Sequence, residues 1–304
     1  MLQCFGQRKE RMKGGLAVKV GEKCARCLYD HQVQKSTDPD YLAQVKDIIE
    51  GRSEKDTTAV LVYRIKQVYE RMFGRSDKYS DIKRRYNDLV LQMESGVRKK
   101  IEASDDPLAA ALGFARIGNY IDYGAMHDVD EETFLGLFDN AQLQEKDIAV
   151  YESFLRNCEN ADSFLLITDN CGEIVLDKLL LEQLKLRFPQ LTLQVLVRGD
   201  DVLNDVTLED AAYTGIDRIA QVFSNGKAVA GTVYEMMPED ARRALDNADV
   251  ILAKGQGNYE SLSGQGRHLF YAFLCKCDYF TSQFSVPLLT GMLIEENPDV
   301  VDLA

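Results

Sequence analysis

The chain has 304 residues, of which 45% are hydrophobic and 28% charged, a composition typical of globular proteins that bury a sizeable core. Its formal net charge of -13 argues against non-specific binding to nucleic acid or to anionic membranes as the main activity. No apolar stretch approaches the roughly 20 residues of a membrane span, and no signal-peptide apolar region follows the N-terminus. We therefore expect a cytoplasmic protein whose seven cysteines are reduced thiols.

The first half of the sequence has the pattern of helices. Residues 1–20 show no hydrophobic periodicity, and we expect them to be a mobile leader or a misassigned start. From residue 24 to residue 117, apolar residues recur at helical spacing, and no stretch alternates like a strand. Residues 21–150 are therefore predicted to form a helical domain.

A short segment after these helices carries polar side chains that core packing does not require. In residues 118–124, GNYIDYG, Asn119 and Asp122 lie between glycines. The composition predicts a turn, and the two side chains make the segment a candidate site. His127 follows this segment. We interpret it as a surface residue, because a lone exposed histidine is seldom a ligand.

The pattern changes from about residue 150 to an alternation of strands and helices. Residues 151–304 are therefore predicted to form an α/β domain. The apolar runs predict strands at 164–167, 191–197, 219–223 and 249–253, with at least one more within 269–277 and 282–288.

The strand predicted at 164–167 ends at Asp169 and Asn170, two side chains fit to hold a cation. Gly172 permits a sharp turn, and an apolar stripe at helical spacing follows it. In an open α/β sheet, ligands bind at this edge. The alternative is that the two residues only cap the following helix.

Polar residues recur at the ends of the next predicted strands, in RGDDVLND, SNG and KGQGN. Thr207 with Asp210 resembles a capping box, which leaves Asp205 available to face the same sheet edge as Asp169. Carboxylates and amides without histidine or thiolate suit a hard cation such as Mg²⁺ or Mn²⁺. Lys254 would add a positive charge for a phosphate, although a solvated strand end is the plain alternative.

Other phosphate chemistries do not match the sequence. The glycine-rich turn after Lys254 lacks the GK[ST] ending of a Walker loop. No cysteine is followed six positions later by arginine, as a cysteine-dependent phosphatase requires. Asp169 is followed by Asn-Cys, where aspartyl-phosphate enzymes need Asp-x-Asp. Hydrolysis by metal-activated water remains.

Four ordered motifs together resemble the damage-control phosphatase family, which is similar to metal-dependent carbohydrate-phosphate phosphatases. The similarity covers about residues 24–295, and the CxxC motif formed by Cys24 and Cys27, together with Lys276-Cys277, resembles the microbial branch of the family. One departure is Asp201, at a position where the family often has proline. The four motifs are GNYIDYG at 118–124, DNCGE at 169–173, RGDDVLNDVT at 198–207 and KGQGNYESL at 254–262.

The resemblance implies a helical domain on a three-layer α/β/α, Rossmann-like domain, and hydrolysis of small phosphate esters such as sugar phosphates or damaged phosphometabolites. It implies a divalent cofactor, Mn²⁺, Mg²⁺, Co²⁺ or Ni²⁺, and a small-molecule phosphate ester as the partner. The net charge and the lack of a long apolar stretch argue against nucleic acid and membrane as partners, and the sequence predicts no oligomeric state. The implied metal ligands are Asp169, Asn170 and Asp205, the implied catalytic residues are Asp169, Asp205 and Lys254, and the candidate substrate residues are Asn119, Glu173, Lys254 and Asn258.

Two other functions stay open from the residues alone. A methyltransferase would hold S-adenosylmethionine on a Rossmann-like sheet at the glycine turn after Asp169, but the GxGxxG-like order is missing. A non-enzymatic metal or metabolite-binding protein is the other alternative.

The cysteines give a separate prediction. Cys24 and Cys27 begin the helical domain and Cys277 follows an apolar segment of the α/β domain, so docking of the two parts would bring the three together. Such a thiolate cluster would bind zinc, with Cys275 as a candidate fourth ligand. The alternative is that these thiols pack as small apolar groups.

Overall fold

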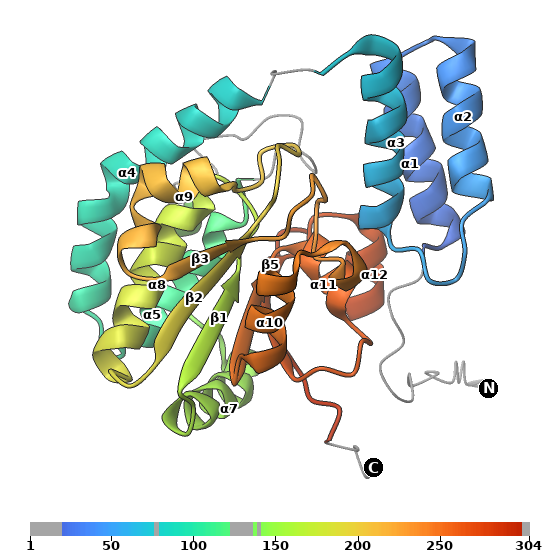
Figure 1. The fold of residues 1–304 in the computed structure, drawn as a ribbon. Coiled ribbons are helices and arrows are strands. Elements are labelled where there is room, and N and C mark those ends of the chain that lie inside the picture. Colours follow the sequence, from blue (N-terminus) through green and yellow to red (C-terminus); the bar gives the residue numbers. More distant parts are fainter. Residues whose placement is uncertain (1–19, 76–78, 122–135, 139–140, 300–304) are drawn as a thin grey trace, which may run out of the picture.

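The computed structural model describes residues 20–75, 79–121, 136–138 and 141–299, and Figure 1 shows their arrangement. The N-terminal helices α1 (Glu22–Lys35), α2 (Pro39–Glu50) and α3 (Thr58–Phe73) form a bundle beside the rest of the chain. Their apolar stripes meet in a core of their own, in which Tyr41, Val45 and Leu61 are fully buried. The side chains of Asp38 and Thr57 cap the starts of α2 and α3.

The remainder of the chain is built on a six-stranded sheet in the order β3-β2-β1-β4-β5-β6. All neighbouring strands are parallel except β6, which runs antiparallel to β5. The strand order reverses between β1 and β4, and this switch point is where open α/β sheets bind ligands. The strands are β1 (Ser163–Ile167), β2 (Thr192–Val197), β3 (Gln221–Ser224), β4 (Val250–Lys254), β5 (Leu269–Leu274) and β6 (Gly291–Glu296).

Helices cover both faces of the sheet, which gives three layers (Figure 1). On one face lie α4 (Ser80–Glu102), α5 (Pro107–Gly118), α7 (Ile148–Glu159), α8 (Glu173–Arg187) and α9 (Leu208–Thr214). On the other face lie α10 (Glu239–Asn247), α11 (Gln256–Leu262) and α12 (Asp278–Phe284). Short 3-10 helices occur at Glu145–Asp147, Ile216–Arg218 and Tyr234–Met236.

The predicted α/β fold with an N-terminal helical part is confirmed, but the hydrophobic cores do not divide at residue 150. Helices α4, α5 and α7 share one core with the sheet, and α5 packs along the length of α8. The separate bundle therefore ends with α3. Helical spacing indicates that a segment is a helix, but it does not indicate which core the helix joins. The expected leader, residues 1–20, lies outside the described residues except for its last one.

The four strands predicted around the site are confirmed within two residues at each end. The apolar segment 269–277 contains β5, as expected. The segment 282–288 is not a strand: it holds the end of α12 and a loop, and the chain enters the sheet again only at β6. In the part of the chain that the structure describes, no helix has the length and apolar character needed to cross a membrane.

Candidate functional site

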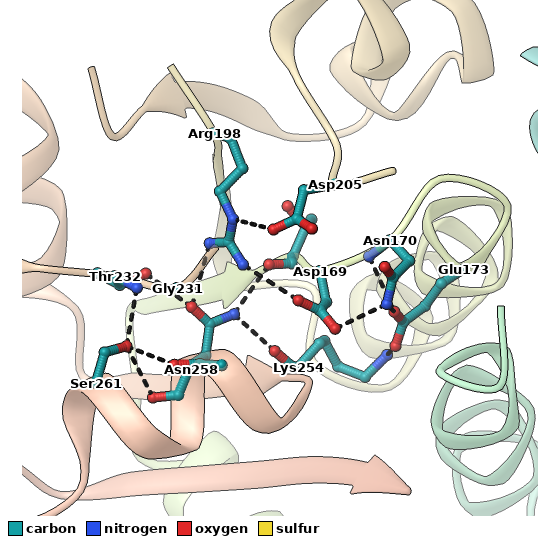
Figure 2. Close-up of polar contacts among 12 residues, drawn as sticks. Asp169, Asn170, Glu173, Arg198, Asp205, Gly231, Thr232, Lys254, Asn258 and Ser261 are labelled. Atoms are coloured by element: carbon teal, nitrogen blue, oxygen red, sulfur yellow. Dashed lines mark hydrogen bonds and ion pairs between the residues drawn. The ribbon is translucent and has the colours of Figure 1, made fainter. Parts of the chain in front are cut away.

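Polar side chains from three neighbouring strand ends meet at the switch point of the sheet (Figure 2). Asp169 and Asn170 follow β1, Arg198 follows β2, and Lys254 is the last residue of β4. Each lies at the carboxyl end of its strand, so the parallel pairing of β2, β1 and β4 brings them to one edge.

Asp169 and Asn170 do not cap the following helix, which excludes the plainer alternative. The N-cap of α8 is Gly172, with a φ of 81° that favours glycine, and no side chain caps it. Instead, Oδ2 of Asp169 accepts hydrogen bonds from Nδ2 of Asn119 at 3.0 Å and from Nδ2 of Asn170 at 2.8 Å. The Asp169 carboxylate is thus held by two amides and is directed into the site.

Arg198 is the central cation of the site, and its guanidinium group is fully buried. Its Nε donates to Oδ2 of Asp205 at 2.6 Å, and its Nη2 donates to Oδ1 of Asp169 at 3.2 Å. Its Nη1 donates to Oδ1 of Asn258 at 3.2 Å. We call Arg198, Asp169 and Asp205 the Arg198 cluster; the planar guanidinium fixes the two carboxylates relative to each other.

Asp205 reaches this edge because the helix start after it is capped by other residues. The predicted capping box is present: both the backbone N–H and the hydroxyl of Thr207 donate to Oδ2 of Asp210. Backbone pairing then joins the two acidic segments, since the N–H of Val206 donates to the carbonyl of Asp169 at 2.9 Å. An isolated bridge between Asn170 and Asp205 completes this pairing.

The turn after β4 packs directly against Asp169. Gly255 has a φ of 81°, and a Cβ at this position would lie 2.0 Å from Oδ2 of Asp169. Asn258, in the first turn of α11, donates from Nδ2 to the carbonyls of Thr168 at 3.0 Å and of Lys254 at 2.6 Å. The Gly-Gln-Gly-Asn segment therefore ties β4 to the end of β1, rather than forming an open loop.

Lys254 is directed inward, away from solvent. Its Nζ donates to Oε1 of Glu173 at 2.6 Å, to Oδ1 of Asp177 at 2.7 Å and to the carbonyl of Ala115 at 2.9 Å. Glu173 and Asp177 are four residues apart in α8, so both carboxyl groups lie on the helix face toward β4. We call Lys254, Glu173 and Asp177 the Lys254 cluster. All three ammonium hydrogens are used within the protein, unlike the solvated strand end considered from the sequence.

Burial and mutual charge alter the acidities in the Lys254 cluster. Burial raises the pKa of Asp177 to about 7, although Lys254 acts to lower it; Glu173 raises it further. For Lys254, burial alone would lower the pKa, but the attraction of Asp177 and Glu173 outweighs it and the pKa is raised. The lysine is therefore a permanent cation, and Asp177 is the group that can change its charge near neutral pH.

The donors around Asp169 fit a hard divalent cation. Two carboxylates and an amide, with no thiol or imidazole among them, suit Mg²⁺ or Mn²⁺. The close approach of Gly255 to Asp169 shows that the backbone leaves no space behind this carboxylate, so its position is fixed. Asp169, Asn170 and Asp205 are the residues that would hold the metal. No group of three or more His, Cys, Asp or Glu side chains placed for metal binding occurs among the described residues.

The absence of a ready-made metal group among the described residues extends to the predicted thiolate cluster. Cys24, Cys27 and Cys277 come from α1 and from the start of α12, and they do not form a group able to hold a metal in the described part of the chain. Burial raises the pKa of Cys24 to about 11, and the neighbouring Glu260 and Cys277 raise it further. Burial therefore favours the thiol form of Cys24.

Sequence reasoning did not assign a role to Arg198 or Asp177. Arg198 stood within a quoted motif, at a strand end next to Asp205, so the rule that identified Asp169 would have identified it. Asp177 had no such signal, because a polar residue in a helix is normally exposed. Of the residues singled out in 118–124, Asn119 joins the site, while Asp122 lies outside the described residues, as does His127.

The fold and the site define an α/β protein with acidic and amide side chains gathered at the switch point of its sheet. The family model described as the damage-control phosphatase ARMT1-like domain matches residues 18–288. A damage-control phosphatase of Archaeoglobus fulgidus is 33% identical over 274 residues, which cover 86% of this chain and 93% of that protein. The chain therefore belongs to the ARMT1-like damage-control phosphatase family, as the four motifs predicted.

Two further comparisons agree with this family assignment. Damage-control phosphatase PH1575 of Pyrococcus horikoshii is 27% identical over 221 residues, covering 71% of this chain and 74% of that protein. A solved structure of a DUF89 family protein from Pyrococcus horikoshii superposes with a TM-score of 0.70 and 23% identity, covering 91% of this chain and 99% of that chain. The structural similarity supports the fold.

Proposed function

We propose that the protein is a divalent-metal-dependent phosphatase that hydrolyses small phosphate esters, such as sugar phosphates or damaged phosphometabolites. Membership of a damage-control phosphatase family supports the phosphatase class. The observation that carries the metal dependence is the meeting of Asp169, Asn170 and Asp205 at the switch point of the sheet. The methyltransferase alternative has no support in the family comparison.

The charges of the Arg198 cluster favour this proposal. Two carboxylates and one guanidinium leave a single negative charge at the sheet edge, which attracts a divalent cation. With the cation bound, the group has a single positive charge and attracts an anionic ester. This local reversal matters because the whole chain has a net charge of -13 and would otherwise repel a phosphate.

The chain's own residues then position the reactants. Asp169, Asn170 and Asp205 would hold the metal, which would supply Lewis-acid activation of water and of the phosphoryl group. Arg198 keeps the two carboxylates at a fixed separation while its own charge opposes their repulsion. Asp169 and Asp205 are also the carboxylates that we propose to act directly in catalysis.

The remaining proposed site residues support these ligands. Asn119 and Asn258 hold Asp169 and Arg198 by hydrogen bonds. Glu173 accepts from Nδ2 of Asn119 at 3.2 Å and from the N–H of Asn170 at 3.1 Å. Lys254 stabilises Glu173 by donating a hydrogen bond to its Oε1, the oxygen that does not contact Asn170. We place these four buried residues around the proposed metal ligands, which they orient; the full burial of Lys254 gives it a supporting role rather than direct contact with a phosphate.

The test is a panel of phosphate esters assayed for phosphate release with Mn²⁺, Mg²⁺, Co²⁺ and Ni²⁺, each against a chelator control. The proposal predicts turnover of at least one sugar phosphate or related ester that requires a divalent cation. Turnover that is unaffected by chelation would contradict the metal dependence. Absence of turnover across the panel would favour a metabolite-binding protein.

A further inference from the structure

Asp177 is buried without full hydrogen bonding. Among the described residues, its Oδ2 is the only buried side-chain oxygen or nitrogen that lacks a hydrogen-bond partner. Its Oδ1 accepts from Nζ of Lys254 at 2.7 Å, and both side chains are fully buried. A buried polar atom without a partner costs stability, so its presence calls for a functional explanation.

Hydrogen bonds connect Asp177 to the proposed metal ligands. The Nζ of Lys254 also donates to Oε1 of Glu173 at 2.6 Å. The other oxygen of Glu173 accepts from the backbone N–H of Asn170 at 3.1 Å, and Nδ2 of Asn170 donates to Asp169 at 2.8 Å. The ammonium group of Lys254 is therefore linked through Glu173 to the backbone of Asn170.

The surroundings of Asp177 leave it two charge states. Lys254 faces it from β4 and Glu173 from its own helix, while α5 contributes the uncharged carbonyl of Ala115 to the same ammonium. Arg116, the next residue of α5, pairs instead with an aspartate that precedes α7. With Asp177 protonated, Lys254 and Glu173 balance each other. With Asp177 ionised, both carboxylates attract the ammonium.

We propose that Asp177 is a positioning residue, which in its ionised form fixes the ammonium of Lys254 and thereby the orientation of Glu173 and Asn170. Its pKa of about 7, raised chiefly by burial, makes the change between the two states fall near neutral pH. The kinetic consequence rests on the proposed phosphatase function. The structural consequence, a stability that depends on pH, is independent of that function.

The kinetic test compares pH profiles of kcat for the wild type, Asp177→Asn and Asp147→Asn. The carboxamide has the shape of the acid but cannot ionise, so Asp177→Asn has no charged form to gain. Asp147→Asn is the matched control: it changes a buried carboxylate that pairs with Arg116 at 2.7 Å, away from the metal ligands. Effects of general destabilisation appear in both variants.

The proposal predicts that the wild-type kcat rises through about pH 7, and that Asp177→Asn loses this step. At about pH 8 the variant should be slower by about tenfold, whereas the two should be equal near pH 5.5. Asp147→Asn should keep the wild-type step. A profile of Asp177→Asn that is parallel to the wild type would overturn the proposal.

Stability separates this proposal from the phosphatase proposal. A carboxyl group whose folded-state pKa is raised gives stability that is complete below its unfolded pKa and is lost as the pH rises through about 7. The wild-type melting temperature should therefore fall more than that of Asp177→Asn between about pH 5 and pH 8. Equal falls would overturn the proposal even if turnover is absent. If Asp177→Asn does not fold, the test is to follow the carboxyl carbon of Asp177 by NMR in the wild type. Titration of this carbon in the ordinary aspartate range would refute the proposal.

Discussion

The Arg198 cluster and the Lys254 cluster have the same composition, two carboxyl groups around one basic side chain, but different access. The side chains of Asp169 and Asp205 are 10% and 5% exposed, whereas those of Glu173 and Asp177 are 0% exposed. The first cluster is the more accessible of the two, as the metal site that we propose there requires. The second is sealed and can change its charge only by a proton.

This difference explains why similar residues serve different purposes. An arginine holds two carboxylates in a fixed fork, which suits the proposed role of Asp169 and Asp205 as metal ligands. A lysine between two sealed carboxyl groups instead leaves one of them able to take up a proton. We infer that the Arg198 cluster binds the cation and that the Lys254 cluster sets the orientation of its ligands.

The largest expected effect is on catalysis at the Arg198 cluster. Asp169→Asn should lower kcat by more than the roughly 10–100-fold that loss of an outer partner of a metal ligand costs. The fold should be kept, because the amide has the same shape. The matched control is Asp200→Asn, which alters an exposed carboxylate paired with Arg75. Metal-dependent turnover by Asp169→Asn at the wild-type rate would remove this residue from the metal site.

The next effect is on stability, measured by urea unfolding in chelator. Arg198→Met leaves two buried carboxylates without their cation and should reduce the free energy of unfolding by about 3–5 kcal/mol. Added Mn²⁺ should restore part of this loss, since the metal replaces the missing charge.

Lys254→Met provides the comparison for the same measurement. Its loss should be of similar size at about pH 8 but smaller at about pH 5, because Asp177 can protonate. Added Mn²⁺ should restore less of the lost stability in Lys254→Met than in Arg198→Met. Equal recovery of both variants by Mn²⁺ would show that the two clusters do not differ in access.

A smaller effect is expected at Gly255. Alanine at this position adds a Cβ that meets Asp169 at 2.0 Å, whereas alanine at Gly266, where φ is also positive, meets nothing within 4 Å. Both substitutions should cost about 1–2 kcal/mol from backbone conformation, measured by thermal unfolding. Only Gly255→Ala should also lower kcat, and an equal kcat in the two variants would contradict the tight packing at Asp169.

The smallest effect is expected far from both clusters. Cys27→Ser changes an exposed thiol and should alter the free energy of unfolding by less than about 0.5 kcal/mol. Protein purified under reducing conditions should contain no stoichiometric zinc. Zinc at one equivalent, lost in Cys27→Ser, would establish the thiolate cluster instead.

The sequence predicted the Arg198 cluster better than the Lys254 cluster, for a physical reason. Strand ends in a parallel sheet meet at one edge, so Asp169, Asn170 and Asp205 were predicted together from apolar runs and turns. The direction of Lys254 depends on α8, which presents Glu173 and Asp177 toward β4. That packing joins segments distant in sequence, and periodicity does not encode it.

The same limit applies to the fold. Every strand that borders the site was predicted, because each is a buried apolar run between turn residues. The sequence did not predict which core α4, α5 and α7 join, since their apolar stripes fit either the N-terminal bundle or the sheet. Strand β6 also escaped prediction, because GMLIEE lies at the sheet edge with only one buried residue.

The central claim, that the Arg198 cluster and not the Lys254 cluster holds the cation, is tested most directly by calorimetric titration of Mn²⁺ into three proteins. We expect one binding site in the wild type, its retention in Asp177→Asn, and its loss in Asp205→Asn. Retention of Mn²⁺ binding in Asp205→Asn with its loss in Asp177→Asn would place the cation at the Lys254 cluster instead.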